Sequence, residues 1–208
     1  MAGTLSDARI VLASSSPRRR DLLNMIGIGH EIMPADIDES LRIGETPQAY
    51  AERLAREKGA AVAPRVPGAF VISADTIVVA RGEVLGKPRS ETDAARMLRT
   101  LSGTTHKVLT AVAVTSTGRV ESGVEAVDVE IRHLTDEEIL DYIATGEPMD
   151  KAGSYGIQGY GATIVERISG DVFAVMGLSL GLVVRLMGRF GLRYDFQSSA
   201  PAARNRQC

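Results

Sequence analysis

Residues 104–132 read T-T-H-K-V-L-T-A-V-A-V-T-S-T-G-R-V-E-S-G-V-E-A-V-D-V-E-I-R, and they determine the architecture. Apolar and β-branched residues dominate Thr104–Ser116 and recur through Arg119–Arg132, and Thr117-Gly118 separates the two runs. β-branched residues favour strands, and a short glycine-containing turn between two such runs is typical of a hairpin. Because a hairpin is antiparallel, we expect a mixed sheet rather than an all-parallel one.

Strand-like and helix-like segments alternate on both sides of this hairpin. Further strands are predicted over 9–13, 30–34, 69–80 and 162–168. Helices are predicted over 16–26, 46–62, 90–101, 135–145 and 178–190, several of them beginning at a Ser or Thr suited to an N-cap. The pattern predicts an α/β fold: a mixed central β-sheet with flanking helices, in two lobes with a central cleft. We expect one domain over 1–196, with the boundary between its two lobes near residue 105, and a polar tail over 197–208.

Composition narrows the class of protein. Hydrophobic residues make up 44% of the 208-residue chain and charged residues 24%, which suits a folded core. The formal net charge is 24 − 26 = −2, so no overall basic field favours binding to nucleic acid. The lone Cys208 excludes an intrachain disulfide and fits a reducing cytosol. No apolar run suits a signal peptide or a membrane span, so we expect a soluble, cytoplasmic protein.

The chain does not match three common sequence signatures of nucleotide-binding or metal-binding sites. The run G-E-V-L-G-K at 82–87 is one residue short of a P-loop, and Pro88 stands where that motif needs Ser or Thr. Gly27-Ile28-Gly29 lacks the third glycine of a dinucleotide fingerprint. The three histidines are far apart in sequence, and His106 and His133 are expected at the surface or a sheet edge.

The run S-S-S-P-R-R-R at 14–20 follows a predicted strand and opens a helix. A helix N-terminus is already positive, so each arginine placed there costs about 0.3–1 kcal/mol in an isolated helix. An anion bound at the turn would remove that conflict, because serine hydroxyls, free amides and guanidinium groups form a phosphate cradle. The alternative is a solvated basic turn.

Two charged residues interrupt apolar patterns. Asp75 lies within the run F-V-I-S-A-D-T-I-V-V at 70–79, and a buried carboxylate needs a cation, a metal or a shifted pKa. The choice lies between a catalytic or metal-binding role and a structural salt bridge. Lys58 shares the helical face of Ala51, Ala55 and Val62, so its ammonium either contacts phosphate or extends along the core to solvent.

Three loops add further candidates. Gly86-Lys87-Pro88 holds a lysine just downstream of Asp75. The acidic segment D-I-D-E-S at 36–40 could supply carboxylates to magnesium, or be a solvated loop. The glycine-rich segment D-K-A-G-S-Y-G-I-Q-G at 150–159 allows close backbone approach to a ligand, and Gln158 can donate to and accept from a base edge. Together these features suit a nucleoside triphosphate with magnesium.

The set of motifs resembles the Maf family of nucleotide pyrophosphatases, also called septum-formation inhibitor-like proteins. The matching pieces, in family order, are L-A-S-S-S-P-R-R-R (12–20), D-I-D-E-S (36–40), S-A-D-T-I-V-V (73–79), G-E-V-L-G-K-P (82–88), L-S-G-T-T-H (101–106) and D-K-A-G-S-Y-G-I-Q-G (150–159). Each piece is short, but the ordered set is specific.

The resemblance implies a fold similar to that of inosine-triphosphate pyrophosphatases. It implies hydrolysis of a nucleoside triphosphate to the monophosphate and pyrophosphate with a divalent cation, Mg²⁺ or Mn²⁺. The family's general base falls on Asp75 and its supporting acid on Glu39, both also metal ligands in this reading. Its phosphate-binding residues fall on Ser14, Arg18 or Arg19, Lys58 and Lys87. A homodimer is plausible for the family.

The choice of base can also be addressed. The 7-methyl-GTP-preferring branch of the family has a tryptophan, a glutamine and a glutamate where this chain has Arg18, Thr76 and Gln158. A cationic methylated guanine suits an aromatic face and a carboxylate, which are absent at these positions. The chain therefore resembles the dTTP/UTP branch. The alternatives are a non-enzymatic, nucleotide-sensing regulator of cell division or septum formation, and a phosphatase releasing single phosphates.

Overall fold

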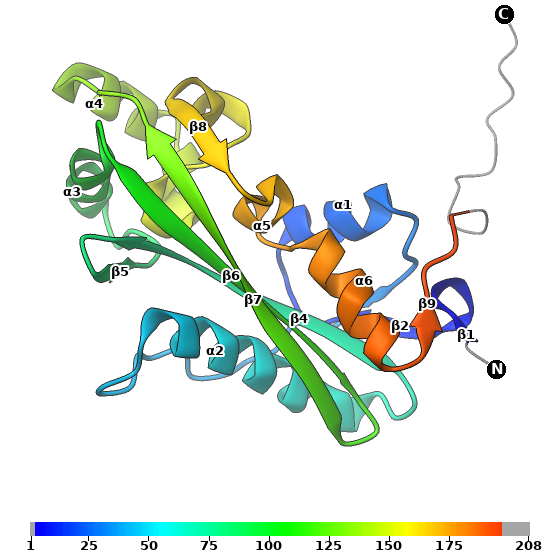
Figure 1. The fold of residues 1–208 in the computed structure, drawn as a ribbon. Coiled ribbons are helices and arrows are strands. Elements are labelled where there is room, and N and C mark those ends of the chain that lie inside the picture. The colour runs from blue at the N-terminus through cyan, green and yellow to red at the C-terminus, as the bar shows by residue number, and fades with distance from the viewer. Residues whose placement is uncertain (1–2, 197–208) are drawn as a thin grey trace, which may run out of the picture.

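The computed structural model describes residues 3–196 (Figure 1). Its central sheet has the strand order β3-β2-β4-β6-β7-β8, with β5 paired to β4. The strands are β2 (Ile10–Leu12), β3 (Glu31–Ile32), β4 (Phe70–Ala80), β5 (Glu83–Leu85), β6 (Thr105–Ser116), β7 (Arg119–Ile131) and β8 (Val165–Ser169). A separate small sheet joins β1 (Gly3–Thr4) to β9 (Leu192–Arg193) in parallel.

The long hairpin is confirmed. β6 and β7 pair antiparallel from Thr105↔Glu130 to Ser116↔Arg119. Thr117 and Gly118 form the turn with φ of +48° and +78°, the left-handed region that such hairpin turns require. β2 runs parallel to both β3 and β4, whereas β4, β6, β7 and β8 pair antiparallel. The sheet is therefore mixed, as predicted.

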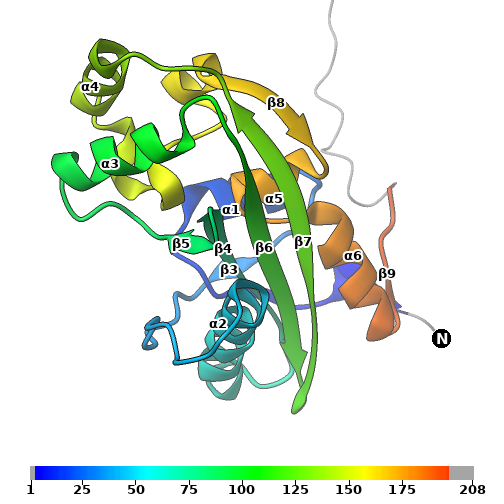
Figure 2. The ribbon, with the colours of Figure 1, turned by 60° about the vertical axis from the view of Figure 1, so that its left-hand side comes forward.

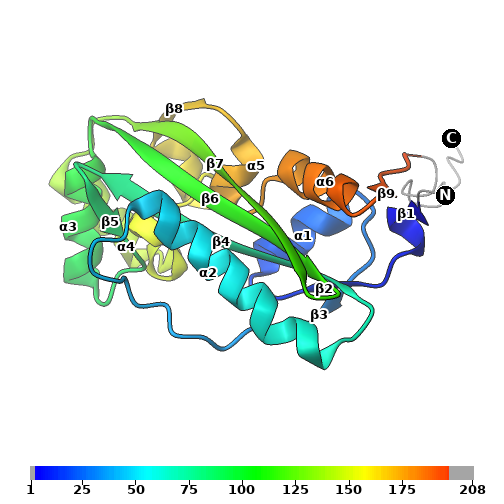
Figure 3. The same ribbon diagram turned by 60° about the horizontal axis from the view of Figure 1, so that its bottom comes forward.

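Helices cover both faces of the sheet. They are α1 (Pro17–Met25), α2 (Pro47–Val62), α3 (Glu91–Leu101), α4 (Asp136–Ala144), α5 (Val172–Met176) and α6 (Leu180–Arg189). Figure 3 shows α2 lying across β4 and β6, with α1 and α6 on the other side of the sheet. The period of two along β6 explains this arrangement: Ala111 and Ala113 cluster with α2, and Val112 and Val114 with α1 and α6.

The helix starts follow the predicted caps. The Ser90 hydroxyl accepts a hydrogen bond from the Asp93 amide. Thr135 and Glu138 form the reciprocal capping box. Each such cap stabilises its helix by about 1 kcal/mol, because it satisfies amides that the helix leaves unpaired.

The apolar core divides into two main clusters. One joins α3 and α4 to β7 and the far end of β4, at the end of the molecule seen in the upper left of Figure 2. The other joins α1 and α6 to β2 and the start of β4. Both clusters contain residues from before and after residue 105, so the lobes do not divide the chain at that point. Within residues 3–196, no helix has the length and apolarity that crossing a membrane requires.

Several elements differ from the sequence predictions. The sequence does not predict the short elements β1, β5, α5 and β9. The strand predicted over 30–34 is only two residues long, β3, and both residues are exposed. Gly177, with φ of +114°, ends α5 before the last helix begins. The expectation that His106 lies at the surface or at a sheet edge is wrong: it is 3% exposed, and its strand β6 lies between β4 and β7. The expected tail over 197–208 lies outside the described residues.

Candidate active site

A cavity of about 800 Å³ opens between the two core clusters, and every predicted site residue lines it. We call one side the strand wall; it consists of Ser14, Arg18, Arg19, Glu39, Lys58, Asp75 and Thr76. We call the other side the loop wall; it consists of Lys87, Glu147, Asp150, Lys151, Tyr155 and Gln158. The turn at 14–19 and Asp75 therefore share one cavity, although 56 or more residues separate them in sequence.

The serine-arginine turn leaves its helix amides without a side-chain cap. Ser16 occupies the N-cap position of α1, but its hydroxyl makes no capping hydrogen bond. Ser14 instead accepts from the Ser16 amide at 3.2 Å. Since the first turn of a helix has unpaired N–H groups and a partial positive charge, this end of α1 is suited to an anion in the cavity.

The three arginines of the turn have different surroundings. Arg19 donates from Nη1 to Ser14 Oγ at 3.2 Å and from Nε to the Gly177 carbonyl at 2.8 Å, so its guanidinium is fixed. Burial lowers the pKa of Arg19, and the charge of Asp75 opposes that shift. Arg20 pairs with Asp21 and does not line the cavity. Of the three arginines in this turn, Arg18 and Arg19 are therefore the two that can contact an anion in the cavity.

Asp75 has a buried cation as its partner. Lys58 Nζ donates to Asp75 Oδ1 at 2.7 Å, and each side chain is 10% exposed. The same ammonium lies 2.7 Å from Glu39 Oε1, and Glu39 is 57% exposed. Lys58 therefore does not extend to solvent but joins the two carboxylates at the cavity wall. Among the described residues, none donates to Asp75 Oδ2, which is left to accept a proton.

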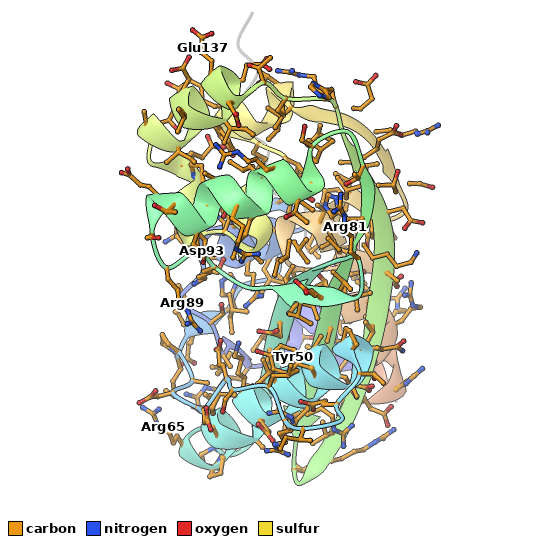
Figure 4. The ribbon with its side chains drawn as sticks, turned by 90° about the vertical axis from the view of Figure 1, so that its left-hand side faces the viewer. Tyr50, Arg65, Arg81, Arg89, Asp93 and Glu137 are labelled. Carbon is orange, nitrogen blue, oxygen red and sulfur yellow. The ribbon has the colours of Figure 1, made fainter. Side chains whose placement is uncertain are left out.

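Helix α2 also holds the loop that carries Glu39. Tyr50 donates its hydroxyl to the Glu39 carbonyl at 2.6 Å, and Arg53 donates to the Ser40 carbonyl at 3.0 Å. Figure 4 labels Tyr50 on the side of α2 that faces β5. Burial and the charge of Asp75 raise the pKa of Tyr50. Sequence reasoning missed Tyr50, although its spacing of eight residues from Lys58 places both on one helical face.

The hydroxyl of Thr76 is hydrogen-bonded to Arg19 and to Thr110. Thr110 donates to the Ala174 carbonyl at 2.7 Å, and its hydroxyl oxygen lies 2.9 Å from that of Thr76. Thr76 therefore donates to Thr110, and its oxygen accepts from Arg19 Nη2 at 3.4 Å. The residue expected to influence base choice thus contacts the guanidinium of the turn directly.

The loop wall presents two side chains without protein partners. Lys87 and Gln158 are exposed at the cavity, and neither side chain bonds to any residue within 3–196. Below them, Tyr155 is 4% exposed, and its hydroxyl lies 2.7 Å from His106 Nε2. Sequence reasoning missed Tyr155 and Glu147 as cavity residues.

One ion pair crosses between the two walls. Arg18 Nη1 of the strand wall lies 3.2 Å from Asp150 Oδ2 of the loop wall. Asp150 also pairs with Lys151 at 2.6 Å. Burial raises the pKa of Asp150, but the hydrogen bond and charge of Lys151 and the charge of Arg18 outweigh it, so the pKa lies below its usual value. Asp150 is therefore an anion against which a phosphate would compete for Arg18.

The donor set fits a divalent cation bound together with phosphate. No group of three His, Cys, Asp or Glu side chains able to hold a metal occurs among residues 3–196. Mg²⁺ in phosphate-processing sites uses one or two carboxylates plus substrate oxygens, rather than a cage built wholly from protein. Asp75 and Glu39, brought together by Lys58, provide such a pair of carboxylates.

Comparisons with known proteins show which proteins this chain is similar to. A protein of Geobacillus sp. (strain WCH70) named dTTP/UTP pyrophosphatase is 49% identical over 183 residues, covering 88% of this chain and 98% of its own. One of the same name from Anaeromyxobacter dehalogenans (strain 2CP-1 / ATCC BAA-258) is 52% identical over 187 residues, covering 88% and 94%. Among solved structures, the Staphylococcus aureus Ham1 protein aligns with 88% of this chain and 96% of its own, at 17% identity and a TM-score of 0.48. The sequence model of the family described as Maf-like protein matches residues 9–190, and the chain belongs to that family.

Proposed function

We propose that this protein hydrolyses the nucleoside triphosphates dTTP and UTP to the monophosphate and pyrophosphate. The observation that carries the proposal is the convergence on one cavity of a cationic turn, a lysine-linked pair of carboxylates and an unpartnered amide. The names of the relatives, each about half identical over nearly the whole of its length, support the choice of these two nucleotides.

The cationic groups account for binding of the triphosphate. Arg18, Arg19 and Lys87 line the cavity together with the uncapped end of α1. Guanidinium groups bind phosphate oxygens with paired, charge-assisted hydrogen bonds, and free helix amides add to them. Arg19 is held in place by Ser14 and the Gly177 carbonyl, so little order is lost when it binds.

Asp75 is proposed as the general base. A water oxygen attacks the α-phosphorus, the bond between that phosphorus and the α–β bridging oxygen breaks, and pyrophosphate leaves. The proton of the water passes to Asp75 Oδ2, while Lys58 holds Oδ1 and so fixes the carboxylate. Mg²⁺ or Mn²⁺ bound with the substrate would neutralise charge on the phosphate oxygens. We propose Asp75 and Glu39 as the residues that hold the cation.

Gln158 is proposed to recognise the base. Its amide can donate to O4 and accept from N3–H of thymine or uracil. Thr76 lines the same cavity, and its hydroxyl contacts the Arg19 guanidinium and Thr110. We also propose a cytosolic location and a homodimer, which cell fractionation and sedimentation would test.

The test is a panel of nucleoside triphosphates assayed for pyrophosphate release with Mg²⁺ and with Mn²⁺. We expect dTTP and UTP to give the highest kcat/KM, with the monophosphate and pyrophosphate as products. Nucleoside diphosphate and phosphate as products would contradict the proposed bond cleavage. Binding of dTTP without turnover in either metal would contradict the enzyme and favour a nucleotide-sensing regulator.

A further inference from the structure

We propose that Tyr142 and Glu147 are positioning residues that set the size of base the cavity accepts, by fixing the loop that carries Gln158. The inference rests on the proposed function and goes beyond it, because neither residue is needed for the hydrolysis step. Tyr142 lies in the last turn of α4, and Glu147 begins the 3₁₀ turn that follows that helix.

The two side chains bind the backbone of the loop on both sides of Gln158. The Tyr142 hydroxyl accepts from the Gly156 amide at 3.1 Å and donates to Glu147 Oε1 at 2.8 Å. Glu147 accepts from the Tyr160 and Gly161 amides, each at 2.9 Å. Backbone amides before and after Gln158 are therefore held by one connected pair of side chains.

The glycines of the loop show how closely it fits this pair. A Cβ on Gly161 would lie 2.2 Å from the Gly156 carbonyl oxygen and 2.6 Å from the Tyr142 hydroxyl. A Cβ on Gly159 would lie 2.3 Å from Glu147 Oε2, at a φ of +65° that also disfavours other residues. Close approach to Glu147 and Tyr142 thus explains the glycines at 159 and 161.

This positioning matters because the hydrogen-bonding pattern of an amide does not distinguish base size. Thymine presents O4 beside N3–H, and guanine presents O6 beside N1–H, so one glutamine amide pairs with either edge. The purine is the longer ring system, and its edge lies farther from the sugar and phosphates. Discrimination therefore depends on the distance between the cations that hold the phosphates and the Gln158 amide. The Gln158 side chain bonds to no other described residue, so its reach into the cavity starts from wherever the loop backbone places its Cα.

The anchor itself is rigid. Tyr142 is 6% exposed and packs in the core cluster that contains α3, α4 and β7. Burial raises the pKa of Tyr142, so its hydroxyl is protonated at neutral pH and can donate to Glu147. The strand wall contributes no side chain to these contacts, so Tyr142 and Glu147 can shift Gln158 without touching Asp75 or Lys58.

The test compares kcat/KM for dTTP and dGTP in Tyr142→Phe and Glu147→Gln. Each variant removes hydrogen bonds worth about 1 kcal/mol apiece, so we expect the dTTP:dGTP ratio to fall about tenfold. The change should lie mainly in KM for dTTP, while kcat for dTTP stays within about twofold. In Glu147→Gln the new NH₂ group must face one of the loop amides, whichever way the side chain is turned.

Matched controls exclude a general loss of stability. Tyr194→Phe removes a hydroxyl that donates to the Ile26 carbonyl away from the cavity, and Glu137→Gln changes an exposed carboxylate on α4, at the end of the molecule opposite Tyr50 in Figure 4. Both should keep the wild-type ratio. If Tyr142→Phe does not fold, Glu147→Gln and Gly159→Ala still test the inference.

A double-mutant cycle separates positioning from a merely structural role. In a Gln158→Ala background, Glu147→Gln should change the dTTP:dGTP ratio no further, because the ratio is set through Gln158. Hydrogen exchange of the amides at 156, 160 and 161 should accelerate in both single variants. An unchanged ratio despite faster exchange, or an equal loss for both nucleotides, would overturn the inference. Wild-type protein that releases no pyrophosphate from dTTP would instead overturn the proposed function.

Discussion

The strand wall and the loop wall of the cavity are built by different means. Asp75 lies inside β4, which pairs with β6 over nine residues, and Lys58 projects from the sixteen-residue helix α2. The loop wall consists of short 3₁₀ turns whose backbone is held by the Tyr142 and Glu147 side chains. The proposed base Asp75 and its partner Lys58 are therefore anchored in regular secondary structure, whereas base recognition depends on side-chain contacts to a loop.

This difference separates two kinds of change. Residues in a sheet or a long helix move little when a neighbour is replaced, because the backbone ladder fixes them. A loop held by a few side chains can shift when one contact is lost. Substitutions in the strand wall should therefore affect rate or stability, and substitutions under the loop wall should affect selectivity.

The largest effect is expected for Asp75→Asn in the strand wall. The amide keeps the shape of the carboxylate but cannot accept the proton of the attacking water, so kcat should fall by about 10³-fold. Pyrophosphate release measures the rate, and circular dichroism checks the fold. Asp36→Asn, in an exposed residue of the acidic loop that does not line the cavity, should leave kcat unchanged. Metal-dependent hydrolysis retained by Asp75→Asn would contradict the assignment of the base.

The next effect concerns stability. Lys58→Met leaves Asp75 without its cation in a site where the carboxylate is 10% exposed. Removing one partner of a buried ion pair costs about 3–5 kcal/mol, and urea denaturation would measure that loss. Adding Asp75→Asn to Lys58→Met should restore part of the stability, because it removes the unpaired charge.

Arg56→Met provides the control on the same helix. Arg56 is exposed and donates to Ser122 at 2.9 Å, so its replacement should change the free energy of unfolding by no more than about 0.5 kcal/mol. If Lys58→Met cost no more than Arg56→Met, the ion pair would not stabilise the strand wall.

A buried histidine of β6 supports the loop wall from behind: His106 Nε2 lies 2.7 Å from the hydroxyl of Tyr155. Burial lowers the pKa of His106 from 6.5 to about 4, and the charge of Asp128 opposes the shift only weakly. The folded state thus favours neutral histidine, whose contribution is complete above pH 6.5. As the pH falls from 6.5 to 4, the unfolded chain binds a proton that the folded chain does not. Stability should fall by about 3 kcal/mol over that range from this residue.

Urea denaturation between pH 7 and pH 4 measures this contribution in His106→Gln. The variant should show a shallower decline than the wild type, since its side chain does not titrate. His133→Gln, in an exposed histidine, should keep the wild-type profile. Identical profiles for His106→Gln and the wild type would show that His106 does not carry the acid sensitivity.

The strand wall could be predicted from sequence because its charges contradict their local pattern. Asp75 interrupts an apolar strand, Lys58 lies on an apolar helical face, and Arg18 stands at the positive end of a helix. Each conflict requires a partner, and the partners meet in one cavity. The sheet and the longer helices were predictable for the same reason: their periodicity extends over many residues.

The residues that hold the loop wall in place show no comparable conflict between a charge and its local sequence pattern. Tyr142 occupies an apolar position of α4 and reads as a core residue. Its hydroxyl bonds to the Gly156 amide, fourteen residues away, and to the Glu147 carboxylate. The five-residue helix α5 is too short to show a period, and the β1–β9 pair depends on contacts across the whole chain. The burial of His106 could have been predicted, because it shares the alternating strand face of Val108 and Val112.

The smallest effect is expected where the two walls touch. Asp150→Asn removes the carboxylate that pairs with Arg18. The side chain of Asp150 is 64% exposed and that of Arg18 is 36% exposed. Exposed ion pairs contribute about 0–1 kcal/mol, so the free energy of unfolding should hardly change. KM for dTTP should nevertheless fall about twofold, because phosphate no longer competes with Asp150 for Arg18. Asp128→Asn breaks a pair of similar exposure away from the cavity, with Lys107, and should leave KM unchanged. A rise in KM for Asp150→Asn would mean instead that this carboxylate holds Arg18 in its binding position, and the two walls would then depend on each other.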